Sequence, residues 1–409
     1  METFKTHIFS NGLKLIYHEV NHAIASHIAF NIHVGSRDDS ETPGMAHCFE
    51  HMLFKGTKKR KAYNIINRLE IVGGEMNAFT TKEITVLYAS VTHDHFERAL
   101  ELMTDLTFNS VFPDKELVKE KKVISEEINM YLDTPEENIY DEFQEMVFAN
   151  HPLGPNILGN QESILTVDQS KLFSFHKTYY QPQNIALSIS SSIPFKKAIY
   201  WIEKHCILDT KNTNIAKRQV FKKYGAKSFV KQTEHIQCHS ILGNVCYDFN
   251  HPKRIPMLLL NNILGGPGMN SRLNLSIREK FGYTYNIESG YSAFEDTGLF
   301  HCYLSTEKKH LEKANSLLLK ELKKLREFPL TPIQLKQAIS QFKGQISLAE
   351  ENRLNLILAL GKNLVQNYPI ESLESALQKV GQITAKELQD IAQEVFEPSQ
   401  ISSLNFISE

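Results

Sequence analysis

The chain has 409 residues, of which 42% are hydrophobic and 22% are charged. These proportions are typical of a globular protein that can bury a sizeable core, and they exclude a disordered or collagen-like chain. The 45 Lys and Arg residues nearly balance the 47 Asp and Glu residues, which gives a net charge of −2. A dedicated nucleic-acid-binding protein normally has a basic excess, so we expect no nucleic-acid partner.

The cysteines and the hydropathy pattern indicate the compartment. The five cysteines are scattered and form no C-x-x-C pair, which favours a reducing environment over a disulfide framework. No apolar run reaches the roughly 18–20 residues of a membrane span, and the N-terminus lacks the apolar region of a signal peptide. We therefore expect a cytoplasmic protein that makes no membrane contact.

The first half of the chain begins with strands and continues with helices. Apolar residues alternate over 4–9 and 13–20, and the Asn11-Gly12 dipeptide between them favours a β-hairpin. Periodicity, together with Gly and Pro at element ends, predicts the remaining elements. They are strands over 24–34, 78–91 and 184–191, and helices between Thr42-Pro43 and Gly56, over 63–72, over 96–148 with breaks near Pro113 and Pro135, and over 194–206.

The second half repeats this order of elements without repeating the letters. Its predicted strands and helices are strands over 228–233, 240–248, 283–292, 299–305 and 401–407, and helices over 252–264 and most of 308–396. The polar stretch 209–218 is the predicted linker. The sequence therefore predicts an α+β fold with two homologous domains, 1–208 and 219–409, each combining strands with helices.

The first predicted helix carries His47-Cys48-Phe49-Glu50-His51, an H-x-x-E-H pattern. The two histidines are four residues apart, so they project from one helical face and can share a single ion. Zinc suits two imidazoles plus a carboxylate, with a fourth position left for a water that Glu50 could orient. Because the rest of this helix is largely apolar, burying these groups without a metal would be costly. The pattern favours a zinc site over a solvated helix with two incidental histidines.

A third ligand is predicted on a later helix. Leu117, Ile124 and Ile128 form its apolar stripe, and Glu120 and Glu127 fall inside that stripe, seven residues apart. Carboxylates on a buried stripe require a cation. We predict Glu127 as the third ligand, and Glu120 as a residue that supports the ligands or replaces one of them. The competing interpretation is a pair of buried glutamates bonded to lysine.

H-x-x-E-H is the inverted zincin motif, and Glu127 follows His51 by 76 residues. With the segments GGEMNAFTTKEITVLY and SRLNLSIREKFGYTY, the chain resembles the pitrilysin/insulinase family over nearly its whole length. It looks most like single-repeat members related to the β subunit of mitochondrial processing peptidase and to bacterial processing-peptidase-like proteases. The resemblance implies two homologous α+β domains, each a largely antiparallel sheet flanked by helices. Cys48 departs from the apolar residue expected there, and a thiol beside the zinc predicts sensitivity to oxidation.

The resemblance implies a zinc metalloendopeptidase (EC 3.4.24 type) with one Zn²⁺ per chain. Zinc held by His47, His51 and Glu127 would lower the pKa of its bound water towards about 7. Glu50 would then act as the general base on that water and later protonate the leaving amine.

The resemblance also assigns roles to two further sets of residues. Arg278 and Tyr285, in the second domain, would hold the scissile carbonyl and its developing oxyanion. An edge strand would pair with the extended substrate, and its residues are Asn77, Ala78, Phe79 and Thr80. Without the resemblance, the same residues would be an ordinary edge strand.

The implied roles lead to an expected assembly. Family members with four domains in one chain place the zinc motif in the first half and the Arg/Tyr pair in the second. This chain has only two predicted domains, so we expect Arg278 and Tyr285 to meet the zinc of a second copy. The result would be a closed twofold homodimer with two composite sites. A heterodimer with a homologous subunit is the alternative.

Two other classes of function compete with the peptidase. A non-catalytic chamber or assembly subunit of the same fold would have lost metal ligands or the glutamate base, and this chain keeps all of them. A metal-binding or transport protein would have no need of Glu50. The expected substrates are extended, unfolded peptides of modest length, which strand pairing can bind without regard to most side chains.

Overall fold

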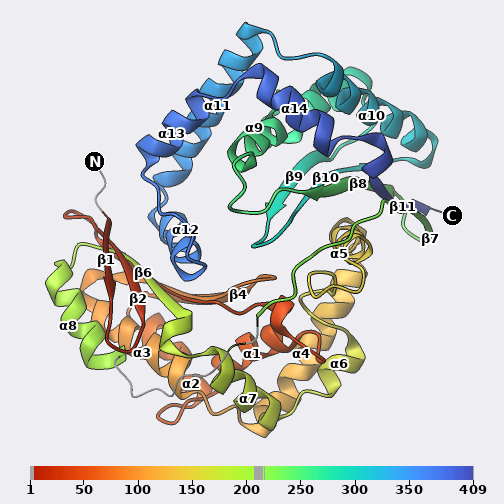
Figure 1. The fold of residues 1–409 in the computed structure, drawn as a ribbon. Coiled ribbons are helices and arrows are strands. Elements are labelled where there is room, and N and C mark those ends of the chain that lie inside the picture. The colour runs from red at the N-terminus through yellow and green to blue at the C-terminus, as the bar shows by residue number, and fades with distance from the viewer. Residues whose placement is uncertain (1–3, 207–214, 216, 409) are drawn as a thin grey trace. The chain divides into compact units, whose positions relative to one another are not determined.

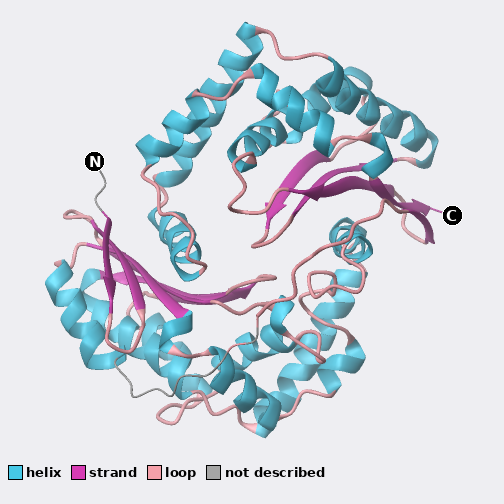
Figure 2. Ribbon diagram, viewed as in Figure 1, coloured by secondary structure: helices cyan, strands magenta, loops and turns pink. Residues whose placement is uncertain are grey.

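The computed structural model describes residues 4–206, 215 and 217–408 (Figure 1). These residues form two compact units, each with one β-sheet and helices packed against it (Figure 2). The predicted α+β class is confirmed. Of the predicted linker 209–218, all but Ile215, Lys217 and Arg218 lie outside the described residues.

Most elements follow the predicted order, but two helices between 161 and 179 were not predicted. The strands are β1 (Phe4–Ile8), β2 (Lys14–Glu19), β3 (Ala25–Ile32), β4 (Glu75–Thr80), β5 (Thr85–Thr92), β6 (Ile185–Ser191), β7 (Ser228–Thr233), β8 (Cys238–Cys246), β9 (Ile287–Ala293), β10 (Gly298–Thr306) and β11 (Ser402–Ser408). The α-helices are α1 (Met45–Leu53), α2 (Ala62–Glu70), α3 (Phe96–Asn109), α4 (Asp114–Leu132), α5 (Pro135–Val147), α6 (Gln161–Leu165), α7 (Gln169–Tyr179), α8 (Phe195–Cys206), α9 (Arg254–Gly265), α10 (Leu311–Glu327), α11 (Pro332–Glu350), α12 (Arg353–Val365), α13 (Leu373–Gly381) and α14 (Ala385–Val395). Two shorter helices matter below, the 3₁₀ turn η1 (Ser36–Asp38) and the π-helix η4 (Asn274–Glu279).

The two sheets share one topology. The first sheet has the order β1-β2-β6-β3-β5-β4, and the second has the order β7-β11-β8-β10-β9. In each sheet a single pair is parallel, β2 with β6 and β7 with β11, and the other pairs are antiparallel. Five strands of each sheet correspond in order and in direction. They are β2, β6, β3, β5 and β4 in the first sheet and β7, β11, β8, β10 and β9 in the second. This match supports the predicted duplication.

Each unit is built from segments that are not continuous in the sequence. The first unit contains Met1–Ile128, Pro155–Arg218 and Ala349–Ser372, and the second contains the intervening segments and the C-terminal part. The continuous domains predicted from the sequence do not describe this arrangement. Helix α5 packs on β8 and β11 of the second sheet, and α12 packs on β2, β3 and β6 of the first. Helical periodicity predicts such a helix but does not specify which sheet its apolar face will cover.

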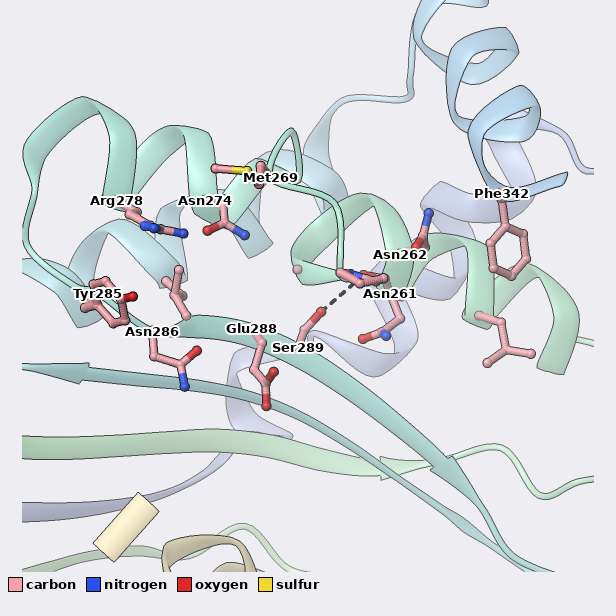
Figure 3. A pocket seen from close by; sticks show the side chains of 15 residues that line it. Asn261, Asn262, Met269, Asn274, Arg278, Tyr285, Asn286, Glu288, Ser289 and Phe342 are labelled. Carbon is pink, nitrogen blue, oxygen red and sulfur yellow. Dashed lines mark hydrogen bonds between the residues drawn. The ribbon is translucent and has the colours of Figure 1, made fainter. Parts of the chain in front are cut away.

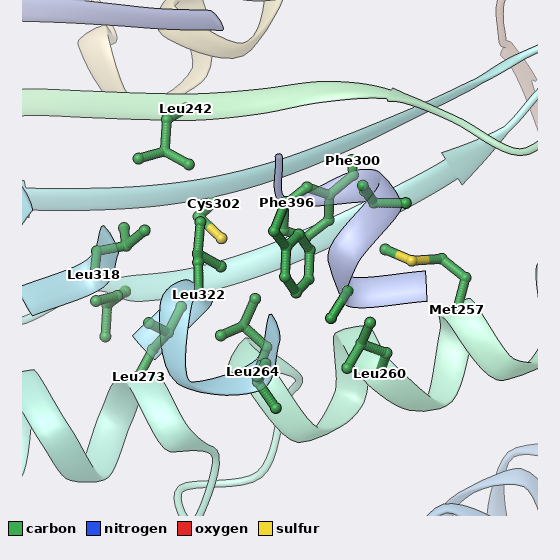
Figure 4. Packing of buried hydrophobic residues seen from close by; sticks show 14 of the residues in the cluster. Leu242, Met257, Leu260, Leu264, Leu273, Phe300, Cys302, Leu318, Leu322 and Phe396 are labelled. Carbon is green, nitrogen blue, oxygen red and sulfur yellow. The ribbon is translucent and has the colours of Figure 1, made fainter. Parts of the chain in front are cut away.

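Each unit has its own apolar core. In the second unit, side chains from β8 and β10 pack against α9, α10 and the end of α14 (Figure 4). The labelled members of this cluster are Leu242, Met257, Leu260, Leu264, Leu273, Phe300, Cys302, Leu318, Leu322 and Phe396. Within the described residues, no helix is both long enough and apolar enough to cross a membrane.

The predicted strand over 78–91 is wrong in one respect. The chain turns back after Thr80, so that β4 and β5 form an antiparallel hairpin in which Thr80 lies opposite Thr85. The turn is closed by the Thr81 N–H, which donates to the Ile84 carbonyl at 2.8 Å. This turn lacks the Gly, Pro or Asn that usually marks one, and its neighbours favour a continuous strand.

A close helix–sheet contact holds α12 in the first unit (Figure 1). The side-chain amide of Asn31 donates to the Ala186 carbonyl and to the Ser188 hydroxyl, at 3.0 Å each. Gly361 of α12 lies directly over these groups. A Cβ at this position would stand 2.1 Å from Asn31 Nδ2 and 2.5 Å from Ser188 Oγ. Glycine therefore permits the approach of α12 to the sheet.

Replacing this glycine tests the contact. Gly361→Ala should destabilise the protein by about 1–3 kcal/mol, because the new methyl group must displace a hydrogen-bonded side chain. The matched control is Gly344→Ala in α11, where an added Cβ meets nothing within 4 Å. Alanine there should be neutral or stabilising by up to about 1 kcal/mol. Urea titration measures both free energies of unfolding, and equal stability of the two variants would contradict the close approach.

Candidate active site

The buried side chain of Asp39 holds the start of helix α1. The two oxygens of Asp39 accept hydrogen bonds from the backbone N–H groups of Gly44, at 2.7 Å, and Ala46, at 2.8 Å. These N–H groups have no partner within the helix, so Asp39 satisfies donors that would otherwise be buried without one. Burial raises the pKa of Asp39 well above its ordinary value, in spite of these two bonds. Asp39 thereby fixes the start of the helix that carries the H-x-x-E-H motif.

Three predicted ligands converge in the first unit. His47 and His51 project from α1, and their Nε2 atoms lie 3.8 and 3.6 Å from Oε2 of Glu127 on α4. One ligand atom from each residue lies within 4.8 Å of the other two. The helical spacing of the histidines and the position of Glu127 on the stripe of α4 account for this convergence.

The donor set and its geometry fit a zinc ion. Two imidazole nitrogens and a carboxylate oxygen are ligands that zinc prefers, at bonds of about 2.0–2.2 Å. In a tetrahedral site with such bonds, neighbouring ligand atoms are about 3.4 Å apart. The measured separations of 3.6 and 3.8 Å are close to that value and too long for hydrogen bonds. These three residues could therefore hold one ion between them.

His47 is held in the neutral form that a metal ligand requires. Burial, with a smaller contribution from the neighbouring His51, lowers the pKa of His47 to about 3. A neutral imidazole keeps the lone pair that a metal requires. The Nδ1 atom of His51 lies 3.2 Å from Oε2 of Glu120, which leaves the Nε2 lone pair directed towards Glu127. A carboxylate behind a histidine ligand orients the ring and raises its basicity.

Glu120 is thus placed behind a predicted ligand and outside the three-residue cluster. Its other oxygen, Oε1, is 2.7 Å from Nζ of Lys55. Burial opposes ionisation of Glu120, but the hydrogen bonds from His51 and Lys55 outweigh it and lower its pKa. An ionised Glu120 is the form that can accept a proton-bearing Nδ1 of His51.

Glu50 lies on the same helix and is only 9% exposed. The Oγ1 hydroxyl of Thr80 donates to its Oε2 atom at 2.6 Å. Burial raises the pKa of Glu50, while the Thr80 hydroxyl and His51 act in the opposite direction. A raised pKa makes this carboxyl group a stronger proton acceptor beside the candidate metal position.

The predicted substrate strand is an open edge. Strand β4, which contains Asn77, Ala78, Phe79 and Thr80, ends the order of the first sheet and pairs with β5 alone among the described strands. Hydrogen-bonded pairs alternate along an antiparallel ladder, and Thr81 pairs with Ile84. By this alternation, the backbone groups of Ala78 and Thr80 face away from β5. The Ala78 N–H accordingly donates to Oδ1 of Asn77, at 2.8 Å, and not to the ladder.

Buried contacts from η1 fix the hairpin beside Glu50. The backbone N–H groups of Ser36 and Arg37 donate to the carbonyls of Thr81 and Lys82, at 3.0 and 2.8 Å. The guanidinium of Arg37 lies 2.6 Å from Oε1 of Glu83, and both side chains are nearly inaccessible to solvent. Removing one partner of such a pair would leave a buried charge uncompensated. The pair therefore holds the turn, and with it the end of β4.

The expectation of a reactive thiol at Cys48 is not supported. The Cys48 side chain is fully buried in α1. Burial raises the pKa of its thiol to about 12. The thiolate is the reactive form, and a buried thiol with this pKa is inert at neutral pH. Cys48 is buried in the core, where a cysteine packs like the small apolar residue that was expected at this position.

Arg278 and Tyr285 lie side by side in the second unit (Figure 3). Arg278 belongs to the π-helix η4, and its guanidinium carbon is 5.3 Å from the centre of the Tyr285 ring. Tyr285 precedes β9 and is 82% exposed. Both residues line one pocket together with polar side chains from α9 and β9, among them Asn261, Asn262, Glu288 and Ser289. An exposed phenol beside a guanidinium offers two hydrogen-bond donors to a ligand.

Several residues that build this site were not predicted. Asp39 stands five residues before Gly44, the N-cap residue of α1, so the usual capping pattern does not identify it. Lys55 stands four residues after His51, a spacing that brings side chains together at the end of α1. Arg37 and Glu83 are 46 residues apart, and no local pattern connects them.

The chain is similar to known proteins over nearly its whole length. The family model described as insulinase (peptidase family M16) matches residues 15–161, and the one described as the peptidase M16 inactive domain matches residues 166–342. An uncharacterized zinc protease of Rickettsia bellii is 30% identical over 98% of this chain and 97% of its own length. The uncharacterized zinc protease YmxG of Bacillus subtilis is 29% identical over 96% of this chain and 95% of its own length.

Solved structures share the fold. A protease from Helicobacter pylori has a TM-score of 0.91 and 22% identity, covering 99% of this chain and 100% of its own. A peptidase M16 inactive domain from Pseudomonas fluorescens has a TM-score of 0.92 and 21% identity, covering 100% of this chain and 98% of its own. The family indicated by the H-x-x-E-H motif, the later glutamate and the duplicated sheets is confirmed: the chain belongs to the insulinase family, peptidase family M16.

Proposed function

We propose that this chain is a zinc-dependent endopeptidase that hydrolyses extended, unfolded peptides. The observation that carries the proposal is the convergence of His47, His51 and Glu127 beside the carboxylate of Glu50, at the end of an open strand edge. These three residues would hold one Zn²⁺ per chain. When bound, the ion supplies Lewis acidity and lowers the pKa of a coordinated water towards about 7. Relatives named zinc proteases support this assignment.

Glu50 is the proposed general base. It takes the proton of the attacking water on its carboxylate and later gives a proton to the nitrogen of the leaving amine. Both steps require a carboxyl group that is ionised before the attack and protonated after it. Burial of Glu50 favours this exchange, because it raises the pKa of the carboxyl group towards the working pH.

Strand β4 is the proposed binding surface for the substrate backbone. An extended peptide can add to its free edge and bond to the outward N–H and carbonyl groups of Ala78 and Thr80. Backbone pairing requires an extended peptide and is indifferent to most of its side chains. The proposed substrates are therefore unfolded peptides. The Asn77 side chain, which now accepts from the Ala78 N–H, would give up that bond to the peptide.

Arg278 and Tyr285 are the proposed partners of the scissile carbonyl. Their donors can bond to the oxygen on which negative charge develops. We propose that each pair serves the zinc site of a second copy in a cytoplasmic homodimer. A heterodimer with a homologous subunit would use the same arrangement. All five cysteines are free, which agrees with a reducing compartment.

A non-catalytic subunit of the same fold is the alternative function. It would need neither a proton acceptor nor a complete set of ligands. Glu50 and all three donors are present and brought together in this chain, which favours the enzyme.

The metal and the base can be tested separately. Wild type should bind about one zinc per chain and cleave a quenched peptide, and His51→Ala should lose the zinc. Glu50→Gln should keep the zinc, and its turnover number should fall about 10²- to 10⁴-fold, because only proton transfer is removed. Glu126→Gln, one residue before Glu127 but exposed, is the matched control and should keep both zinc and activity. Zinc analysis and turnover numbers check this, and near wild-type turnover of Glu50→Gln would refute the base assignment.

Strand addition predicts a periodic effect of backbone methylation. Methyl groups on alternate amide nitrogens of a peptide remove the donors that face β4, whereas methyl groups on the intervening nitrogens do not. One of two such isomeric peptides should therefore lose at least about tenfold in kcat/KM relative to the other. Equal cleavage of the two peptides would show that the substrate backbone does not pair with this edge.

Shared sites predict complementation between inactive variants. Glu50→Gln alone and Tyr285→Phe alone should both be strongly impaired. After mixing and subunit exchange, a heterodimer has one site with both Glu50 and Tyr285 intact. Random pairing should restore about a quarter of the wild-type activity per chain. If subunit exchange is demonstrated and no activity returns, the shared-site arrangement is wrong.

A further inference from the structure

Thr80 connects the strand edge to the proposed base. It is the last residue of β4, and its hydroxyl proton is given to Oε2 of Glu50 at 2.6 Å. The neighbouring hydroxyl of Thr85 is farther away, at 3.4 Å between oxygens. A hydroxyl has only one proton to donate, so the short contact identifies Glu50 as its acceptor.

This bond restricts the orientation of Glu50. A glutamate on a helix can rotate about three side-chain bonds, and a hydrogen bond to a charged oxygen removes much of that freedom. The bond occupies Oε2, while Oε1 accepts no hydrogen bond from any described residue. One carboxylate oxygen is thus held in place, and the other is left available for a proton from water.

The same residue offers its backbone to the peptide. Thr80 lies opposite Thr85, and the next pair towards the turn, Thr81 with Ile84, is hydrogen-bonded. The backbone groups of Thr80 therefore face the free edge of β4. The turn that follows is held by the buried Arg37–Glu83 pair, which supports the position of Thr80.

We propose that Thr80 is a positioning residue whose hydroxyl orients Glu50 and whose backbone sets the register of the bound peptide. This inference rests on the proposed peptidase function. Its consequence is that the peptide bond to be cleaved is aligned with the base by a single residue. Loss of the hydroxyl should reduce turnover and leave peptide binding almost unchanged, because the backbone pairing remains.

Two substitutions at Thr80 separate the hydroxyl from the shape of the side chain. Thr80→Val removes the hydroxyl and keeps the volume, and kcat should fall about 10- to 100-fold with KM changed less than about threefold. Thr80→Ser keeps the hydroxyl and should retain kcat within about threefold of wild type. Both variants should bind one zinc per chain. In a Glu50→Gln background, Thr80→Val should cause no further loss, because the residue acts through Glu50.

The matched control is Thr85→Val. Its hydroxyl lies across the same strand pair and donates to the Val34 carbonyl at 2.9 Å, so its loss should lower thermal stability while kcat stays within about twofold. Near wild-type kcat of Thr80→Val, or equal losses in Thr80→Val and Thr80→Ser, would overturn the role of Thr80 and leave the peptidase standing. Failure of the wild-type protein to cleave any peptide would overturn the peptidase itself and this inference with it.

Discussion

The structure of the first unit depends on keeping two imidazoles and three glutamate side chains together on and beside one nearly buried helix. Polar groups in such a place are unfavourable unless each has a partner. Glu120 lies within hydrogen-bond distance of His51 and forms an ion pair with Lys55. Glu50 accepts a hydrogen bond from Thr80, and Asp39 accepts one at the start of α1. One ligand atom each from His47, His51 and Glu127 faces the other two, at separations that suit an ion. The proposed metal site thus explains the surrounding contacts by a single requirement, which is that its ligands stay fixed.

The duplicated topology places the proposed metal ligands in one unit and the proposed carbonyl-binding pair in the other. In the first unit, α1 carries the H-x-x-E-H motif and β4 is the open edge. In the second unit, α9 and β9 occupy the corresponding places in the topology. Helix α9 is apolar and carries Asn261 and Asn262 in place of ligands, while Arg278 and Tyr285 border the same pocket. Two copies of one architecture have thus acquired different chemistry, since side chains can change while the sheet and helices persist.

Much of this arrangement could be predicted from the sequence, and the failures have physical causes. The i, i+4 spacing of His47 and His51 and the seven-residue spacing of Glu120 and Glu127 are local, so helical periodicity was enough to place them on common faces. The β4–β5 turn at Thr81 was missed because its residues favour strands. The docking of α12 on the first sheet depends on the contact of Gly361 with Asn31, which no local pattern encodes. Cys48 directly follows His47 in the sequence, but its side chain is buried, so its neighbours in the sequence did not predict its surroundings.

The central claim is that two histidines and one glutamate of the first unit hold a single zinc ion. X-ray absorption at the zinc edge of the metal-loaded protein tests it directly, because zinc–sulfur bonds of about 2.3 Å are distinguished from zinc–nitrogen and zinc–oxygen bonds of about 2.0–2.2 Å. The account predicts a four-coordinate site with two imidazoles, oxygen ligands and no sulfur, and the loss of one imidazole or of the ion itself in His47→Ala. A sulfur ligand from Cys48, or an unchanged spectrum in His47→Ala, would contradict it.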